Sequence, residues 1–358
     1  MDFRAVIMAG GAGTRFWPLS KKAKPKQFLP IISEKTMVEE TVHRILPIFP
    51  FHRIYTIANL EQTRILKTLL PDLPKENFLV EPQGKNTAPA LLLATARAYL
   101  QNPKAVLAAL PSDQRITDTP LFLKTLEAGA FAAEEEDFLI TFGISPAFPA
   151  TGYGYIHFSK ESPLKIRGEF FYRVKEFKEK PTHEKAKTFL EEGNYLWNSG
   201  MFLWQADVFA KKLEKHASEL FPFWVRMLDS LESNNEDTME LIFEEIPKIS
   251  IDYGLMERAE GVLVCQGNFG WSDVGAWSSL ADIWPRDKEG NASRGDIIAV
   301  DSKGCVSYNP DKLTVLIGVN DLIVVDTEQA LLVCHKDKDQ KVKDVVSIIE
   351  KKGKGEYQ

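Results

Sequence analysis

Apolar and polar positions follow two periods along the first 142 residues, one typical of buried strands and one typical of amphipathic helices. Short continuous apolar runs predict strands, whereas residues such as Val38, Val42 and Ile45 recur at helical spacing. Strands that alternate with helices of ordinary length indicate a largely parallel sheet with helices on both faces. The predicted strands are 5–9, 53–58, 78–81, 105–110 and 138–142, and the predicted helices are 36–48, 61–70, 87–100 and 121–133.

The pattern changes after residue 149. Glycines punctuate a β segment at 151–156, a strand is predicted at 170–178, and helices are predicted at 183–192 and over 206–246. A polar linker begins near Trp284 and runs to Arg294. Short β-rich runs then recur near residues 297, 305, 314, 323 and 331, and a helix is predicted at 340–352. Their near-constant spacing indicates a small stacked β unit, so we divide the chain into 1–285 and 286–358.

Composition excludes several classes of protein. The 358 residues are 44% hydrophobic and 26% charged, as in ordinary globular proteins, and the net charge of -6 argues against nucleic-acid partners. The three cysteines, Cys265, Cys305 and Cys334, lack metal-ligand spacing, which favours packing roles in a reducing cytosol. No apolar run has the pattern of a signal peptide or the length of a membrane span. We therefore expect a cytoplasmic protein without a membrane partner.

A glycine-rich segment directly follows the first predicted strand. Gly10, Gly11 and Gly13 can present backbone amides to a phosphate group, with Thr14 and the cations Arg15, Lys24 and Lys26 close behind in the sequence. The dinucleotide fingerprint would need a third glycine where Phe16 stands, and Gly13-Thr14-Arg15 does not match a P-loop ending. The pattern instead predicts a cradle for a polyphosphate.

The longer strings GGAGTR (10–15), FWPLS (16–20) and PKQFL (25–29) carry a family resemblance. Together they resemble the signature of sugar-1-phosphate nucleotidylyltransferases. The residues of FWPLS and PKQFL are similar to those of the mannose-1-phosphate guanylyltransferase branch. The resemblance implies a Rossmann-like α/β nucleotidyltransferase domain with a mixed, mainly parallel sheet over residues 1–285. It also implies an incomplete left-handed β-helix and a tail helix in residues 286–358.

Residues 81–89 follow another predicted strand and are a candidate nucleotide site. The carboxylate of Glu81 can accept two parallel hydrogen bonds from the N1–H and exocyclic amine of guanine, which uracil and adenine cannot offer. Asn86 and Thr87 lie in the same segment, which borders the base in the resembled family. Either residue could instead simply cap the helix that begins near Ala88.

Two aspartates are candidate ligands for Mg²⁺, which usually takes one or two carboxylates together with phosphate oxygens and waters. Asp113 follows Ser112, a further candidate for nucleotide contact, at the end of an apolar strand. Asp273 lies between Gly270 and Gly275, far away in the sequence, so their convergence is a prediction about the fold. Each aspartate could alternatively stabilise a turn.

Small glycine-rich turns, a carboxylate and an amide suit a pocket for sugar hydroxyls. Gly152 and Tyr153 supply the turn, and the resemblance assigns sugar contacts to Gly152, Glu179 and Asn198. It assigns a sugar-phosphate contact to Lys180. Structural explanations of each residue alone remain open. The segment 250–257 also resembles the family, but no chemical step can be assigned to Asp252.

The implied reaction converts GTP and mannose 1-phosphate into GDP-mannose and pyrophosphate with Mg²⁺, and a homodimer is expected. The implied catalytic residues are Arg15, Lys26 and Lys180. Two alternatives remain: the same chemistry on another pair, such as glucose 1-phosphate with UTP, or a catalytically silent sensor of nucleotide sugars. A Rossmann-type oxidoreductase is disfavoured by the glycine pattern.

Overall fold

The computed structural model describes residues 1–11 and 13–357, and contacts group them into two compact units. The sheet unit comprises 1–10, 42–112 and 116–271. The cradle unit comprises the described residues of 11–41, 113–115 and 272–358. The division of the sequence at residue 285 stays a prediction. The compact units are defined by contacts between residues, and these contacts place the glycine-rich segment in the same unit as the C-terminal strands.

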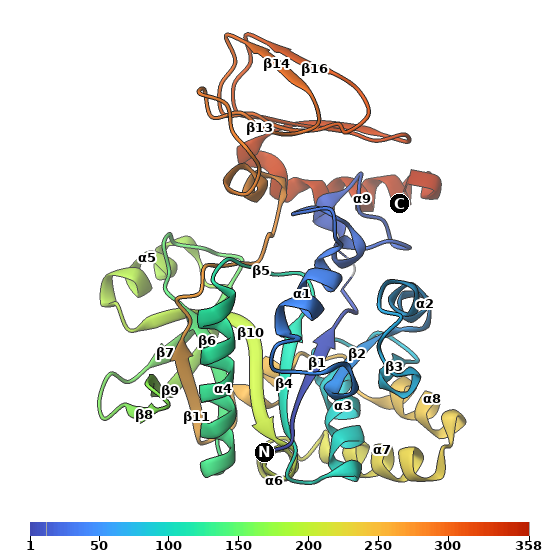
Figure 1. Cartoon of the computed structure of the whole chain (residues 1–358), viewed down its shortest axis with the longest axis vertical. Coiled ribbons are helices and arrows are strands. Elements are labelled where there is room, and N and C mark those ends of the chain that lie inside the picture. The colour runs from blue at the N-terminus through green and yellow to red at the C-terminus, as the bar shows by residue number, and fades with distance from the viewer. Residues whose placement is uncertain (12, 358) are drawn as a thin grey trace. The chain divides into compact units, whose positions relative to one another are not determined.

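The sheet unit is built on ten strands that form one mixed sheet (Figure 1). These strands are β1 (Phe3–Met8), β2 (Ile54–Asn59), β3 (Phe78–Glu81), β4 (Val106–Pro111), β6 (Leu139–Ile144), β7 (Gly154–Phe158), β8 (Leu164–Ile166), β9 (Glu169–Glu179), β10 (Tyr195–Gln205) and β11 (Val262–Gln266). Their order is β3-β2-β1-β4-β10-β6-β11-β9-β7, with β8 on β9. Outside this sheet, β5 (Arg115–Ile116) pairs with β12 (Trp271–Ser272).

The first half of the sheet is parallel, as the alternation of strands and helices predicts. β1 pairs in parallel with both β2 and β4, and β2 pairs with β3. The long strands β9 and β10 introduce the antiparallel pairings, since β10 runs against β4, β6 and β7. The mixed character of the sheet is therefore confirmed, and it arises mainly from two strands.

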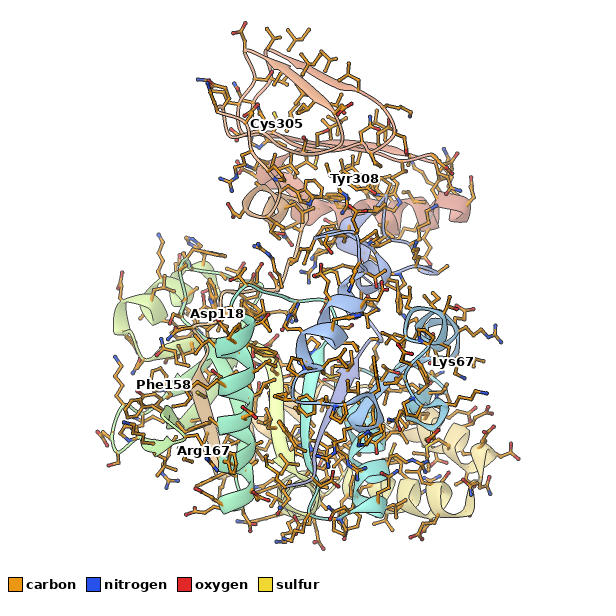
Figure 2. The ribbon with its side chains drawn as sticks, viewed as in Figure 1. Lys67, Asp118, Phe158, Arg167, Cys305 and Tyr308 are labelled. Atoms are coloured by element: carbon orange, nitrogen blue, oxygen red, sulfur yellow. The ribbon has the colours of Figure 1, made fainter. Side chains whose placement is uncertain are left out.

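Helices cover both faces of this sheet. They are α2 (Leu60–Leu69), α3 (Thr87–Gln101), α4 (Thr119–Glu135), α5 (His183–Glu192), α6 (Ala206–His216), α7 (Phe221–Ser233) and α8 (Glu236–Glu245), with short turns at Phe51–Arg53 and Lys75–Asn77. Trp204 of β10 is fully buried in a core that α3, α6 and α7 share. Helix α4 covers the opposite face of the sheet, where its Gly129 lies near Leu203 of β10. Asp118 caps α4 by accepting a hydrogen bond from the Leu121 amide at 3.0 Å (Figure 2).

Most predicted elements agree with the structure within two or three residues, and 78–81 and 183–192 agree fully. The single helical stretch predicted over 206–246 is wrong in its continuity, because α6, α7 and α8 are separate. A turn at 217–220 and the left-handed Asn234 at φ 50° interrupt it. A π-helical turn, η5 (Asp252–Met256), leads toward β11.

The cradle unit combines the glycine-rich segment with the C-terminal strands. Two single turns, η1 (Thr14–Phe16) and η2 (Lys26–Phe28), precede α1 (Met37–Ile45), which begins in this unit. The later elements are η6 (Trp277–Asp282), β13 (Ala292–Arg294), β14 (Ile297–Val300), β15 (Val306–Tyr308), β16 (Thr314–Ile317), β17 (Leu322–Asp326), β18 (Leu331–His335), η7 (Lys336–Lys341), α9 (Val342–Lys351) and η8 (Gly355–Tyr357). β13, β15 and β17 pair in parallel, with β18 antiparallel at the edge, and β14 pairs with β16.

One hydrophobic core holds both parts of the cradle unit together. Phe16, Leu29 and Ile31 are buried in the same cluster as Trp277 and the C-terminal strands. The ring centroid of Phe16 lies 5.1 Å from that of Trp277, and the ring centroid of Tyr308 (Figure 2) lies 5.8 Å from that of Trp277. The indole nitrogen of Trp284 donates to the Ile31 carbonyl at 2.9 Å. The C-terminal segment therefore forms the structural support of the predicted phosphate cradle.

The cysteines are free, and burial raises the pKa of the Cys265 thiol to about 12. Cys305 (Figure 2) is also buried, and Cys334 is half-buried.

In the described part of the chain, no helix has both the length and the apolar character that crossing a membrane requires.

Candidate functional site

The glycine turn of the cradle is held from two sides. Gly13 is left-handed at φ 57°, and a Cβ there would lie 2.5 Å from the backbone nitrogen of Lys26. The Ser20 hydroxyl donates to the Gly13 carbonyl at 2.6 Å, and the Gln27 side-chain amide donates to the Gly11 carbonyl at 2.9 Å. Thr14 begins the turn η1. The turn thus needs a glycine at position 13 because η2 packs directly against it.

Lys26 joins the two predicted metal-binding residues. Its ammonium nitrogen lies 2.9 Å from the Asp113 carbonyl oxygen, 3.3 Å from Asp113 Oδ2 and 2.6 Å from the Asp273 carbonyl oxygen. These three acceptors match the three hydrogens of a lysine ammonium. The side chain of Lys26 is only 6% exposed and lies over the Phe16 ring. All of these residues belong to the cradle unit, where the Asp113 and Asp273 segments both contact Lys26, and the convergence of the two carboxylates on a metal stays a prediction.

The turn that carries Asp273 is strained. Val274 is fully buried and has φ 45°, a left-handed conformation that costs a β-branched residue about 1–3 kcal/mol. Gly275 has no side chain, and a Cβ there would lie 2.5 Å from Asp273 Oδ2. Arg15 is exposed, and its guanidinium donates to the Gly275 carbonyl at 3.3 Å. Packing of the buried Val274 side chain maintains this strained conformation. The same packing fixes the direction of the Asp273 carbonyl.

The metal role of Asp113 and Asp273 stays a prediction, and Asp113 has the exposure and chemistry that a magnesium ligand needs. Among the residues that the structure describes, no group of three or more His, Cys, Asp and Glu side chains forms a protein-only metal cage. Mg²⁺ does not require one, because it usually combines one or two carboxylates with phosphate oxygens and waters. Asp113 is 44% exposed, so one candidate ligand is open to solvent. Lys24, by contrast, is exposed and does not join Lys26 in the cluster.

Glu81 ends β3 in the sheet unit and is only 5% exposed. Its Oε1 atom has no hydrogen-bond partner among the described residues. Burial without compensation raises the pKa of this carboxyl to about 7. A Cβ at Gly10 would lie 3.3 Å from Glu81 Oε2, so the glycine leaves room beside the carboxylate. A buried, unpartnered acceptor of this kind is suited to a ligand that donates hydrogen bonds.

Asn86, Thr87 and Ser112 all have structural partners in the sheet unit. Asn86, at φ 73°, accepts from the Thr87 amide at 2.8 Å and is the N-cap of α3. The capping alternative for Asn86 is therefore observed, and its role in binding a nucleotide stays a prediction. The Ser112 hydroxyl donates to the Met8 carbonyl at 2.8 Å, which ties β4 to the end of β1.

The predicted sugar-binding residues gather around one glycine of β7. A Cβ at Gly154 would overlap the Glu179 carboxylate and lie 3.4 Å from the Cβ of Asn198. Lys180, at φ 46°, forms an ion pair with Glu179 at 2.7 Å. The Lys180 amide donates to the Tyr153 carbonyl at 3.2 Å.

The turn beside this cluster is partly open. Gly152 has open space where a side chain would be, and Tyr153 packs edge-on against Trp197 at 5.0 Å. An aromatic wall, a carboxylate, an amide and a lysine are thus close to one another in the sheet unit.

Several residues that support the site were missed by the sequence reasoning. Ser20 and Gln27 hold the glycine turn, although both lie inside the signature strings on which the resemblance rests. Val274 lies between the predicted ligand Asp273 and Gly275, and a hydrophobic residue gives no signal of a left-handed backbone. Trp277 and Trp284 support the cradle from the far end of the chain, and only the packing reveals this role.

Two known families match successive parts of the chain. Residues 4–290 match the family described as nucleotidyl transferase. Residues 295–348 match a family described as the MannoseP isomerase/GMP-like beta-helix domain. The second match covers the strands β14 to β18 and most of α9.

Similar proteins match nearly the whole chain. The alginate biosynthesis protein AlgA of Pseudomonas putida is 36% identical over 361 residues, which cover 99% of this chain and 73% of AlgA. A mannose-1-phosphate guanylyltransferase of Klebsiella pneumoniae is 35% identical, covering 98% of this chain and 75% of that protein. A crystal structure from Thermus thermophilus, described as mannose-1-phosphate geranyltransferase, has a TM-score of 0.87 and 34% identity, covering 98% of this chain and 100% of that one.

Proposed function

This chain belongs to the nucleotidyl transferase family, and on that premise we propose that it transfers GMP from GTP to mannose 1-phosphate, giving GDP-mannose and pyrophosphate. The observation that carries the proposal is the contact of one buried lysine, Lys26, with both Asp113 and Asp273. A fixed cation between two acidic residues is suited to phosphate chemistry, where positioning and charge stabilisation supply most of the catalysis.

The attacking group needs no general base in this reaction. The phosphate of mannose 1-phosphate is already anionic at neutral pH, and one of its oxygens attacks the α-phosphorus of GTP in line with the departing pyrophosphate. The bond from the α-phosphorus to the bridging oxygen breaks, and that oxygen leaves with the β- and γ-phosphates. Charge that develops on the α-phosphate is stabilised by Lys26, and the departing pyrophosphate is held by Arg15 and the amides of Gly11 and Gly13.

Magnesium is part of the proposal. Asp113 and Asp273 would hold the ion, which supplies positive charge to the phosphate oxygens when bound. Lys26 keeps the two aspartate segments together, because its ammonium contacts the backbone carbonyl oxygens of both. Removing the ammonium would therefore affect the placement of both carboxylates as well as the charge at the α-phosphate.

Recognition of the base and the sugar is assigned to the sheet unit. The buried Glu81 Oε1 atom, which has no partner among the described residues, supports a role for this carboxylate in reading guanine, whose N1–H and exocyclic amine can supply two hydrogen bonds. Asn86, Thr87 and Ser112 complete the proposed nucleotide contacts. Glu179, Asn198, Gly152 and Tyr153 are proposed to contact the mannose hydroxyls. Lys180 would neutralise the phosphate of the sugar.

A panel of substrates tests this function. Pyrophosphate release is measured with Mg²⁺ for GTP, UTP, ATP and dTTP, each with mannose 1-phosphate or glucose 1-phosphate. Strong release only with GTP and mannose 1-phosphate is expected. Release with a different nucleotide would preserve the chemistry and overturn the assignment of Glu81, whereas release with GTP and glucose 1-phosphate would overturn only the choice of sugar. No release from any pair, with binding of GDP-mannose retained, would favour a sensor of nucleotide sugars.

A further inference from the structure

The segment Ile249–Met256, here called the bridging segment, has no role in the chemistry described so far. It contains the π-helical turn η5 and lies entirely in the sheet unit. π-Helical turns are rare and are frequent at functional sites. Its one carboxylate, Asp252, is half-buried. Burial is the main cause that raises the pKa of Asp252, and the charge of Glu179 adds to it.

Asp252 makes a short hydrogen bond to a residue of the proposed sugar site. Its Oδ1 accepts from the side-chain amide nitrogen of Asn198 at 2.6 Å. The oxygen of the same Asn198 amide accepts from the Gly200 backbone nitrogen at 3.1 Å. A side-chain amide has one oxygen and one nitrogen, so these two contacts fix which end points in which direction. One hydrogen and one lone pair of Asn198 remain for a ligand.

The backbone around Asn198 holds only the oxygen end of its side chain, through the Gly200 amide. The pairing of β10 with β6 shifts register between Asn198 and Phe202, and Gly200 is left-handed at φ 71°. Such irregularities re-aim side chains but leave the local ladder incomplete. The Asp252 carboxylate supplies the missing constraint from a different part of the chain.

The other face of the bridging segment is anchored to the start of α3. The Ile251 amide donates to the Thr87 hydroxyl at 2.9 Å, and the Ala88 amide donates to the Ile249 carbonyl at 3.1 Å. Gly254 is buried, and a Cβ there would lie 3.4 Å from the Cβ of Ala88. Asp252 is therefore held by a segment with firm contacts, as a residue that orients another side chain must be.

We propose that Asp252 is a positioning residue that orients the Asn198 amide toward the sugar, from a segment anchored on the helix that carries Thr87. This inference rests on the proposed function, because it assigns Asn198 to the sugar. Without the carboxylate, only the Gly200 amide holds Asn198, so its side chain can turn away from the sugar hydroxyl. The loss then falls on the sugar phosphate and leaves the nucleotide largely unaffected.

A double-mutant cycle tests this role. Asp252→Ala is expected to raise the KM for mannose 1-phosphate about 10-fold or more and to change the KM for GTP less than about twofold. Asp252→Asn keeps an oxygen acceptor at the same place, so it should restore the KM for mannose 1-phosphate to within about threefold of wild type. Adding Asp252→Ala to Asn198→Ala should have almost no further effect on the KM for mannose 1-phosphate, because the amide that Asp252 orients is gone.

Matched controls separate this role from a general loss of charge or fold. Glu240→Ala removes an exposed carboxylate on α8 in the same unit and should leave both KM values within about twofold. Thermal unfolding identifies folded variants. If Asp252→Ala does not fold, Asp252→Ser takes its place in the cycle, because its hydroxyl is too short to reach Asn198. Fully additive effects in the cycle, or equal rises in both KM values, would overturn the positioning role.

Failure of the proposed function can be told apart from failure of this inference. If wild type releases pyrophosphate only from another pair, the proposed function fails, and the same cycle measured with that pair still decides the role of Asp252. If wild type uses GTP and mannose 1-phosphate but the cycle is additive, only the positioning role fails. If wild type neither turns over any pair nor binds GDP-mannose in calorimetry, both fail.

Discussion

The ammonium nitrogen of Lys26 lies 2.6 Å from the backbone carbonyl oxygen of Asp273, a residue 247 positions away in the sequence. The same nitrogen contacts Asp113, so a single buried cation connects three separate stretches of the cradle unit. A lysine in this position supplies positive charge to the cluster and also holds the Asp113 and Asp273 segments together.

Replacing Lys26 should abolish turnover. Lys26→Met keeps much of the apolar stem but removes the charge and all three contacts, so we expect kcat to fall by at least about 10²-fold. Lys24→Met is the matched control, because this lysine is exposed and lies two positions away. Its kcat should stay within about twofold. Pyrophosphate release measures both, and comparable losses in the two variants would contradict the role of Lys26.

A methyl group at Gly13 should destabilise the cradle unit. Gly13→Ala places a Cβ against the backbone of Lys26 and demands φ 57° from an L-residue, so the free energy of unfolding should drop by at least about 1–2 kcal/mol. Gly11→Ala meets no atom within 4 Å and should change the free energy of unfolding by less than about 1 kcal/mol. Urea titrations compare the two, and equal stability would refute the close approach.

Glu81 should make stability depend on pH. The pKa of its carboxyl is about 7 in the folded protein, against an ordinary value of 4.5, so the folded state holds the proton more tightly. Its contribution to stability is complete below pH 4.5 and is lost as the pH rises to about 7, by up to about 3 kcal/mol. Glu81→Gln cannot titrate and should become increasingly more stable than wild type between these two pH values.

Urea unfolding at several pH values measures this difference. Glu76→Gln, at an exposed position, is the control and should show no such trend. The same Glu81→Gln variant should lose its preference for GTP over ATP, because an amide cannot accept both guanine hydrogen bonds. If the preference is unchanged, Glu81 does not read the base.

The glycine-rich segment should not function without the C-terminal strands. A fragment of residues 1–285 lacks Val306, Ile323 and Val346, which share the core of Phe16 and Ile31. It also lacks Arg294, which donates to the Ser33 carbonyl at 3.0 Å. We expect this fragment to release little or no pyrophosphate and its residues 11–41 to be cleaved faster by trypsin than in the full chain. A fragment with full activity would contradict the shared core.

The cradle unit has an exposed apolar face on which the expected homodimer can be tested. On β14 and β16, Ile298 lies opposite Val315 and Val300 opposite Ile317, and all four are about half exposed or more. An exposed apolar face of this kind is typical of an interaction surface, and our prediction is that the expected homodimer uses it. The Ile298→Asp/Ile317→Asp variant should have the monomer mass in light scattering. Leu241→Asp, at an exposed apolar position on α8, should keep the wild-type mass. Identical masses in all three proteins would refute this face.

Local features of the chain could be predicted from its sequence because they depend on neighbours. The strand at 78–81, the helix at 183–192 and the glycine turn before Arg15 all follow from periodicity and turn chemistry. The placement of Glu81 directly at a strand end follows in the same way. Resemblance to a family then supplied the set of candidate residues, including both aspartates.

Tertiary packing alone decided how these residues meet. The antiparallel course of β9 and β10, the contact of Lys26 with Asp273, and the bond between Asp252 and Asn198 join positions that local patterns treat separately. The core that unites Phe16 with the C-terminal strands is likewise invisible in either segment alone. Sequence periodicity reports which face of an element is buried, whereas the partner on that face is selected by shape and hydrogen bonding across the whole chain.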